Sequence, residues 1–401
     1  MKDLKYLYYF ERLLDDANND LVRQASNEGK LAIGYTCFHM PEVLLNVDNC
    51  VSLRMRAPKT GSLDIATYYM SNYTCEYCRA VLERAIEGGY NFLDAIAGVD
   101  ACAQMNRAME NIEIQKLIDK KNFFISHIDV PYKVDEKATA HYVKQLQIKV
   151  LNPLSEKFGV DISDKSLKNA VKLHNDVCRI ITEIGEFRTE ENPRITGYEF
   201  HILNLITYCC PKYLIIDKLR ETLLEIKTRE PNETKNFRAR VVLVGSEIDD
   251  PGLTSLIEDS GALIVADRFC FGSFPGRQEI ILKEGDDILT SICRQYLDQS
   301  QCPRYMSREK IDQRREMVHH YATKFKADGI IYQQIKFCDY WGYERALGSH
   351  VMTTEYGYPV LSLDRPYMSR TSGQLRTRIQ AFVESLEIKA LQKQKEAKYN
   401  D

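Results

Sequence analysis

The sequence of 401 residues contains no apolar run that approaches the roughly 18–20 residues of a membrane-spanning helix. Its first five residues include an early charge pair and lack the apolar centre and the cleavage site of a signal peptide. An excess of one charge is also lacking, since the net charge is −3 and no arginine-rich or glycine-rich tract is present. These absences argue against a membrane protein and against nucleic acid as the main partner. We therefore expect a cytoplasmic protein.

Two nucleotide-binding signatures are missing as well. Gly34 and Gly245 each end a predicted strand, but neither is followed by the further glycines of a dinucleotide fingerprint. No phosphate-binding loop with Gly-Lys-Ser/Thr occurs either. If ATP drives this system, another protein must bind it.

What is present is an ordinary globular composition, with 44% hydrophobic and 28% charged residues and enough length for two domains. Cysteine is the exception, because there are twelve. In a reducing cytosol such residues are thiols or metal ligands rather than disulfides. Five of them are interpreted as core thiols, because they lie beside apolar residues or in a helical pattern: Cys50, Cys178, Cys209, Cys210 and Cys293.

Short apolar runs separated by helical segments predict an α/β fold. The strands are expected at 30–35, 51–54, 92–99 and 123–128 in the first half, and at 240–245, 262–266, 329–335 and 360–363 in the second. Such alternation is typical of parallel sheets built from crossover units. We expect two flavodoxin- or Rossmann-like domains with mainly parallel sheets, joined by a helical connecting region.

The expected boundaries follow from the same patterns. Helical periodicity over 136–158, 163–187 and 214–227 is followed by a polar, proline-containing linker at 229–236. This gives an N-terminal α/β domain at 1–135, a helical connecting region at 136–235 and a C-terminal α/β domain at 236–401. Two prolines are expected in the first turns of helices, and the last helix is expected to begin with a capping box: Pro41 and Pro251, and Thr371 with Gln374.

Three cysteines lie where an α/β fold gathers its ligands. Cys102 follows the 92–99 run, Cys338 follows the 329–335 run, and Cys75 opens a helical pattern. Ligands bind beyond the carboxyl ends of parallel strands and at helix N-termini. We predict one soft-metal site that contains these three thiols, and iron–sulfur chemistry fits it best. His39, His127 and Glu42 also lie near strand ends, but we interpret them as structural hydrogen-bonding residues.

Cys75 and Cys78 form a C-x-x-C pair, which by itself allows a zinc ribbon, a redox dithiol or a cluster site. A zinc ribbon needs a second such pair or two nearby histidines, and neither is present. A thioredoxin-like dithiol should follow a strand, whereas residues 70–74 are polar and loop-like. Because a helix N-terminus stabilises a thiolate, the cluster interpretation is favoured.

Several motifs together resemble the benzoyl-CoA reductase / (R)-2-hydroxyacyl-CoA dehydratase family. They are Cys75-Glu76-Tyr77-Cys78-Arg79, residues 88–94 with Cys102, residues 34–37 with Pro41-Glu42, and the segments 261–267, 328–339, 358–364 and 374–378. The sequence departs from the family pattern at two places. Residues 43–48 replace a small-residue stretch, and Ala103 stands where an aspartate is frequent.

The resemblance implies a component D catalytic subunit with an iron–sulfur cluster between two α/β domains. By motif match, Cys75, Cys102 and Cys338 would hold a [4Fe-4S] cluster and leave its fourth iron open. A separate ATP-dependent iron–sulfur activator protein would deliver a low-potential electron. The substrate would be an acyl-CoA, and the enzyme a dehydratase (lyase) or an acyl-CoA reductase (oxidoreductase). Its partner would be a homologous second subunit, in a heterodimer, or a second copy in a homodimer.

Two alternatives stay open. In a double-cubane reductase of the same superfamily, six cysteines bind an [8Fe-9S] cluster, and Cys37, Cys270 and Cys302 could supply the three extra ligands. Cys78 is a further candidate ligand. In the other alternative the chain is a non-catalytic partner subunit. The sequence names neither the acyl group nor the catalytic base.

Overall fold

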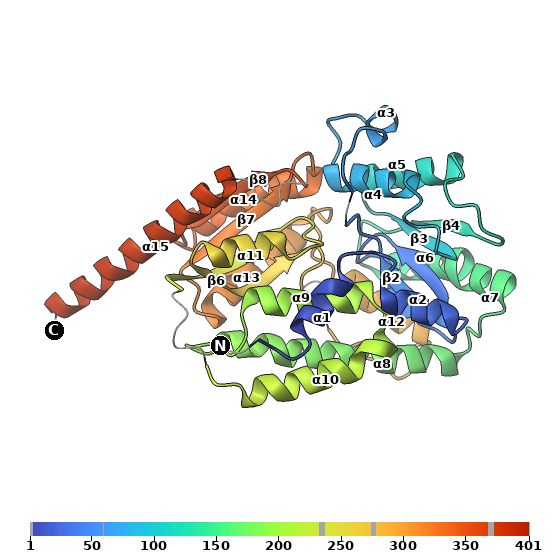
Figure 1. The fold of residues 1–401 in the computed structure, drawn as a ribbon, viewed down its shortest axis with the longest axis horizontal. Helices are drawn as coiled ribbons and strands as arrows, with labels where there is room; N and C mark the ends of the chain where they lie inside the picture. Colours follow the sequence, from blue (N-terminus) through green and yellow to red (C-terminus); the bar gives the residue numbers. More distant parts are fainter. Residues whose placement is uncertain (1–2, 59, 232–236, 274–277, 368–372, 401) are drawn as a thin grey trace.

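Two four-stranded sheets dominate the structure, a computed structural model that describes all residues except 1–2, 59, 232–236, 274–277, 368–372 and 401. Every pair of neighbouring strands in them is parallel. The sheets lie side by side in Figure 1, one from each half of the chain. The prediction of an α/β fold with parallel sheets is confirmed.

The two sheets repeat one topology. The first is ordered β2-β1-β3-β4 and the second β6-β5-β7-β8, so in each the first strand lies between the second and the third. The strands are β1 (Leu31–Tyr35), β2 (Cys50–Arg54), β3 (Ala95–Asp100), β4 (Phe124–Asp129), β5 (Ala239–Gly245), β6 (Ala262–Phe269), β7 (Gly329–Ile335) and β8 (Val360–Arg365). In such sheets a crevice opens beyond the first strand, where the connections leave in opposite directions. Each sheet therefore has one natural ligand position at its carboxyl edge.

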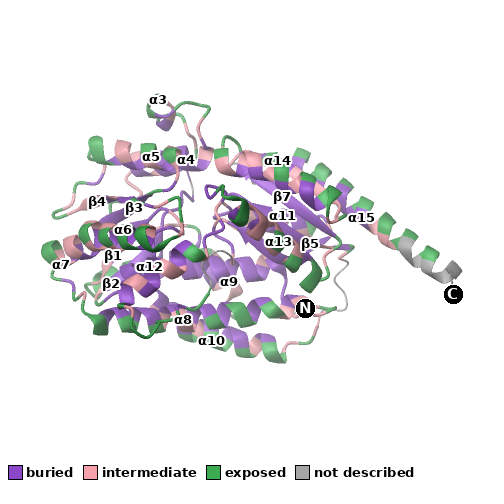
Figure 2. Cartoon of the chain, turned by 180° about the vertical axis from the view of Figure 1, so that it is seen from behind, coloured by how far each residue is buried: buried purple, intermediate pink, exposed green. Residues whose placement is uncertain are grey.

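Helices cover both sheets. Those of the first half are α1 (Leu7–Leu13), α2 (Asp20–Asn27), the 3-10 turn η1 (Glu42–Leu45), α3 (Ala66–Tyr69), α4 (Glu76–Ile86) and α5 (Ala103–Ile114). Those of the second half are α11 (Gly252–Asp259), α12 (Ile288–Asp298), α13 (Arg308–Lys324), α14 (Asp339–Thr354) and α15 (Gly373–Asn400). The far end of α15 extends beyond the body of the molecule in Figures 1 and 2.

Between the halves lies a helical layer. Its elements are α6 (Glu136–Leu146), the π-helical η2 (Gln147–Leu151), α7 (Asn152–Phe158), α8 (Asp164–Glu186), the 3-10 turn η3 (Phe187–Thr189), α9 (Gly197–Cys209) and α10 (Lys212–Thr228). The sequence pattern misses α9. This helix contacts β2 of the first sheet and β6 of the second, and it is buried on all sides, so it has no polar face to reveal its period. Figure 2 shows it almost wholly buried.

Two local expectations need correction. The residues after Pro41 form only the 3-10 turn η1, with Pro41 as its N-cap. Pro251 is the N-cap of α11 rather than part of its first turn. The expected capping box at Thr371 lies outside the described residues.

The helix α12 belongs to the last third of the chain but packs on α6 and α8, beside the core of the first sheet. The three-part division of the chain stays a prediction. None of the helices in the described ranges has the length and hydropathy needed to cross a bilayer.

Candidate metal centre

In the first sheet, two cysteines follow the strands that flank the crevice. Cys37 lies just beyond Tyr35 at the end of β1, and Cys102 lies just beyond Asp100 at the end of β3. Arg54 is the last residue of β2 and is paired in register with Tyr35. The first sheet therefore directs two thiols and one guanidinium toward its carboxyl edge.

The second sheet does the same. Glu247 follows β5, Cys270 follows β6 directly, and Cys338 follows β7 after a short turn. The turn is held by a hydrogen bond from the Cys338 N–H to the carbonyl of Ile335. The carboxyl edges of both sheets thus carry cysteines.

Each of the three predicted cluster thiols caps a helix. Cys75 is the N-cap of α4, Cys102 of α5 and Cys338 of α14. The N–H groups of the first turns help to lower the pKa values of these thiols, as the helix dipole requires. These positions confirm the expected helix start at Cys75.

The thiols form a connected chain. Cys75 accepts hydrogen bonds from the thiols of Cys338 and Cys78, which hold its pKa well below the ordinary value. Cys102 accepts one from Cys78, which lowers its pKa too. As donors, Cys78 and Cys338 have raised pKa values. The structure therefore brings together Cys75, Cys102 and Cys338, with Cys78 between them.

A cavity of about 110 Å³ lies beside these thiols. Five cysteines line it, and they are also the five of the twelve that are only partly buried: Cys37, Cys102, Cys270, Cys302 and Cys338. Cys75 is joined to this set through its hydrogen bond with Cys338. All six cysteines of the double-cubane alternative thus surround one space. The five cysteines interpreted as core thiols are buried, as expected.

The rest of the cavity wall is mostly aromatic, with a few polar groups. Its aromatic members are Phe38, Phe269, Phe271, Tyr340 and Trp341, and its polar ones include His39, Arg54, Glu247, Arg268 and Gln301. Burial raises the pKa of Cys37 to about 12 and the pKa of Cys270 well above its ordinary value, while the positive charge of Arg54 opposes both shifts. An apolar wall of this kind limits the access of water.

The donor set fits an iron–sulfur cluster better than a single metal ion. Within the described ranges no three His, Cys, Asp or Glu side chains are grouped closely enough to hold one ion. In a cubane each thiolate binds a different iron atom, so the ligands surround the metal without sharing one ion. Thiolates that converge from several helix N-termini meet that requirement.

Strained backbone accompanies two of the cysteines. Phe271, next to Cys270, has φ 67°, and Phe337, next to Cys338, has φ 66°. For bulky residues this left-handed conformation costs about 1–3 kcal/mol and persists where the surrounding structure enforces it. Such strain clusters at functional sites, which agrees with the placement of these two cysteines.

Gln104, which the sequence reasoning missed, joins the two halves at the site. Its amide oxygen accepts a hydrogen bond from the backbone N–H of Cys75. Its amide nitrogen donates to the carbonyl of Phe337 at 2.9 Å and to Asp339 Oδ2 at 2.7 Å. One side chain on α5 therefore aligns the starts of α4 and α14. Its place two residues after Cys102 was the only signal in the sequence.

Arg54 and Glu247 were also missed. The guanidinium approaches both carboxylate oxygens at 3.4 Å, across the two sheets. Burial raises the pKa of Glu247 to about 7, and the attraction of Arg54 only partly offsets this effect. The pair is thus a weakly compensated charge at the cavity wall.

The three residues interpreted as structural make structural contacts. His39 contacts Ser300 Oγ at 2.9 Å, and His127 contacts Glu113 at 2.8 Å. Glu42 forms ion pairs with His174 and Lys212. These contacts support the structural interpretation.

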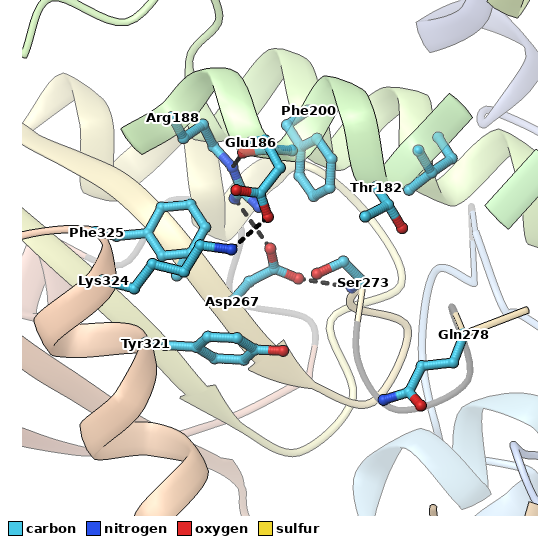
Figure 3. Close-up of a pocket in the computed structure, with 13 residues that line it drawn as sticks. Thr182, Glu186, Arg188, Phe200, Asp267, Ser273, Gln278, Tyr321, Lys324 and Phe325 are labelled. Carbon is cyan, nitrogen blue, oxygen red and sulfur yellow. Dashed lines mark hydrogen bonds and ion pairs between the residues drawn. The ribbon is translucent and has the colours of Figure 1, made fainter. Parts of the chain in front are cut away.

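A second and larger cavity, of about 230 Å³, lies between α8, α9, β6 and α13 and contains no cysteine. Figure 3 shows its charged groups facing one another, Arg188 toward Asp267 and Lys324 toward Glu186. Because these charges are paired with one another, the cysteine cavity is the stronger candidate for chemistry.

Comparison with known proteins agrees with this geometry. Residues 37–386 match the model of the family described as 2-hydroxyglutaryl-CoA dehydratase, D-component. The chain belongs to this D-component family. The matched span contains all seven candidate cysteines, from Cys37 to Cys338.

Three relatives cover nearly the whole chain at low identity. The (R)-phenyllactyl-CoA dehydratase beta subunit of Clostridium sporogenes is 23% identical and covers 95% of this chain and 99% of its own length. The beta subunit of (R)-2-hydroxyglutaryl-CoA dehydratase from Acidaminococcus fermentans is 22% identical, over 90% of this chain and 93% of its own. One of the subunits of benzoyl-CoA reductase from Thauera aromatica is 20% identical, over 94% and 97%. The relatives of this chain thus include named dehydratase and reductase subunits.

Proposed function

We propose that this D-component protein is the iron–sulfur subunit of a radical-type 2-hydroxyacyl-CoA dehydratase or of a benzoyl-CoA reductase-like enzyme. The observation that carries the proposal is the chain of contacting thiols drawn from both halves of the molecule, Cys102 to Cys78 to Cys75 to Cys338. The names of the relatives supply the substrate class, an acyl-CoA. Because several relatives are named as subunits, we propose a homologous second subunit or a second copy as partner.

Cys75, Cys102 and Cys338 would hold the cluster. When bound, a [4Fe-4S] cluster with one open iron supplies a site that accepts an electron and polarises a thioester carbonyl as a Lewis acid. The helix N-termini stabilise the negative charge of the three thiolates. Gln104 fixes two of these N-termini relative to each other, and the aromatic wall of the cavity limits the entry of water.

The energy for the low-potential electron has to come from a donor. We propose an ATP-dependent iron–sulfur activator protein, since the sequence has no phosphate-binding loop of its own. The abundance of free thiols agrees with a reducing compartment, which supports a cytoplasmic location.

One observation favours the second candidate, a double-cubane reductase. Cys37, Cys270 and Cys302 line the same cavity as Cys102 and Cys338, although they come from separate segments of the chain. A subunit that binds a single cubane has no need of three more partly exposed thiols at that wall. With an [8Fe-9S] cluster, all six would be ligands and the cavity would hold the cluster rather than an acyl group.

Anaerobic purification with iron and sulfide counts tests the proposal. A single cubane gives about four irons per chain and a double cubane about twice as many. The triple variant with Cys37, Cys270 and Cys302 replaced by alanine should keep its iron in the first case and lose about half or more in the second. A chain that binds no iron after reconstitution, while it remains folded, would refute both candidates and leave the non-catalytic subunit.

A further inference from the structure

Arg54 is a buried cation at the wall of the cysteine cavity. It is the last residue of β2, its side chain is only 3% exposed, and it lines the cavity together with Cys37, Cys102 and Cys270. Burial of a guanidinium is costly unless its charge and its N–H groups find partners. The position therefore demands an explanation.

The partners that the structure gives Arg54 are incomplete. Its ion pair with Glu247 is 3.4 Å long, whereas well-formed charge-assisted hydrogen bonds measure about 2.7–2.9 Å. Its Nε atom is buried and has no hydrogen-bond partner among the described residues. The guanidinium lies over the ring of Phe271 at 3.7 Å, which provides cation–π contact but accepts no conventional hydrogen bond.

Other buried arginines of the chain are paired more closely. Arg188 donates to Asp267 at 2.9 Å and Arg314 to Glu344 at 3.0 Å. Arg54 is thus a buried positive charge with a loose counter-ion and an unused donor, placed against the thiols that we propose as ligands. An iron–sulfur cluster carries negative charge, which increases when it is reduced, and its sulfur atoms accept hydrogen bonds.

We propose that Arg54 tunes the cluster site, by placing its positive charge beside the cluster and so raising the reduction potential. The inference rests on the proposed function, because it requires a cluster in the cavity. Removal of this charge should make the reduced state less favourable, since the added electron then loses an attractive interaction. The cluster would still bind through its cysteines.

The variant Arg54→Met tests this, with Arg188→Met as a matched control. Arg188 is equally buried, lies over Phe200 at the same 3.7 Å and has one carboxylate partner, but it lines the other cavity (Figure 3). The measurement is a redox titration with titanium(III) citrate, followed by electron paramagnetic resonance. Each one-electron reduction oxidises one titanium(III) to titanium(IV). Iron content and circular dichroism are measured on every sample.

Arg54→Met should retain its iron and show an equilibrium constant for reduction at least tenfold lower, a shift of about 59 mV to more negative potential for a one-electron couple. Arg188→Met should leave the potential unchanged. A folded, iron-loaded Arg54→Met with the wild-type potential overturns the inference. Equal shifts in both variants overturn it too, because they would reflect a general loss of packing.

Glu247→Gln provides an independent test if Arg54→Met does not hold its iron. At pH 8.5, above the pKa of Glu247, this variant removes the counter-ion and leaves the charge of Arg54 uncompensated. The potential should then move in the positive direction, and an unchanged potential overturns the inference. A wild-type chain without any cluster refutes the proposed function itself, and the inference with it. A loaded wild type whose potential is insensitive to Arg54 refutes the inference alone.

Discussion

Cys75 shows at the scale of one residue how local structure prepares a thiol for metal binding. As the N-cap of α4 it lies at the positive end of a helix, and the thiols of Cys338 and Cys78 donate hydrogen bonds to it. Both effects favour the thiolate, the form that binds metal. The same residue type elsewhere, for example Cys293 in α12, is buried and has a raised pKa because burial disfavours its charge.

The variant Cys75→Ala should lose most of its bound iron. The fold should survive with a loss of about 1 kcal/mol in the free energy of unfolding, because a single small side chain is removed. Cys293→Ala, which shortens a thiol in the core, is the matched control and should keep its iron. Iron assay after anaerobic reconstitution and urea denaturation measure the two effects, and full iron content in Cys75→Ala would rule out its role as a ligand.

His174 in α8 belongs to a buried network of charged groups. Its Nδ1 contacts Glu42 Oε1 at 2.8 Å, its Nε2 contacts the thiol of Cys178 at 3.3 Å, and Lys212 lies 2.8 Å from the other oxygen of Glu42. Burial lowers the pKa of His174, but Cys178 and Glu42 outweigh it and raise the pKa to about 10. The imidazole is therefore charged in the native state at neutral pH.

This network predicts a dependence of stability on pH. The pKa of His174 in the native state lies above its unfolded value of about 6.5, so its contribution is complete below that pH and is lost as the pH rises toward about 10. The contribution is on the order of 3 kcal/mol. The free energies of unfolding of the wild type and of His174→Gln should therefore converge between pH 6.5 and 9.5 in urea denaturation. Parallel curves over this range would contradict the prediction.

At the scale of the element, close contact between strands aligns the carboxyl edge of the second sheet. Gly245 ends β5 with φ 148°, and a Cβ atom there would lie 1.8 Å from the carbonyl oxygen of Gln333 in β7. Ser246 and Glu247 follow it immediately, so this contact positions the residues that face the cavity. Only glycine fits at this point.

Gly245→Ala should therefore cost about 3 kcal/mol in the free energy of unfolding, because β5 and β7 must separate locally. Gly61→Ala is the control, since nothing lies within 4 Å of a Cβ atom at that position. Thermal and urea denaturation would measure the difference between the two variants. Equal stability of the two would show that the sheet adapts without cost.

At the scale of the whole molecule, the two sheets are held in one arrangement by α9 and by the contacts of Gln104. The proposed centre uses residues from both halves, so it depends on this arrangement. A centre of this kind can hold an electron but has no source of one in the chain itself.

We predict that the purified chain alone does not turn over acyl-CoA substrates. It should be sensitive to oxygen, and activity should require the partner subunit together with an ATP-dependent reductase or a strong artificial reductant. Anaerobic assays with each component left out in turn would measure this dependence. Steady turnover in air without reductant would contradict the mechanism.

The sequence alone determined the elements and the positions of the predicted ligands. Alternation of apolar runs and helical periods is a local property, and it predicted the strands and most of the helices. The places of Cys102 and Cys338 just beyond strands, and of Cys75 at a helix start, followed from the same pattern. The family resemblance came from these local motifs as well.

Only the tertiary structure decided which of these residues meet. Cys37, Cys270 and Cys302 line one cavity with Cys102 and Cys338 because the carboxyl edges of two separate sheets carry them, and no local pattern encodes that packing. The same holds for Gln104 and Arg54, whose partners lie in the other half of the chain. The helix α9 escaped prediction for the same reason, since burial against both sheets removed the polar face by which a period is read.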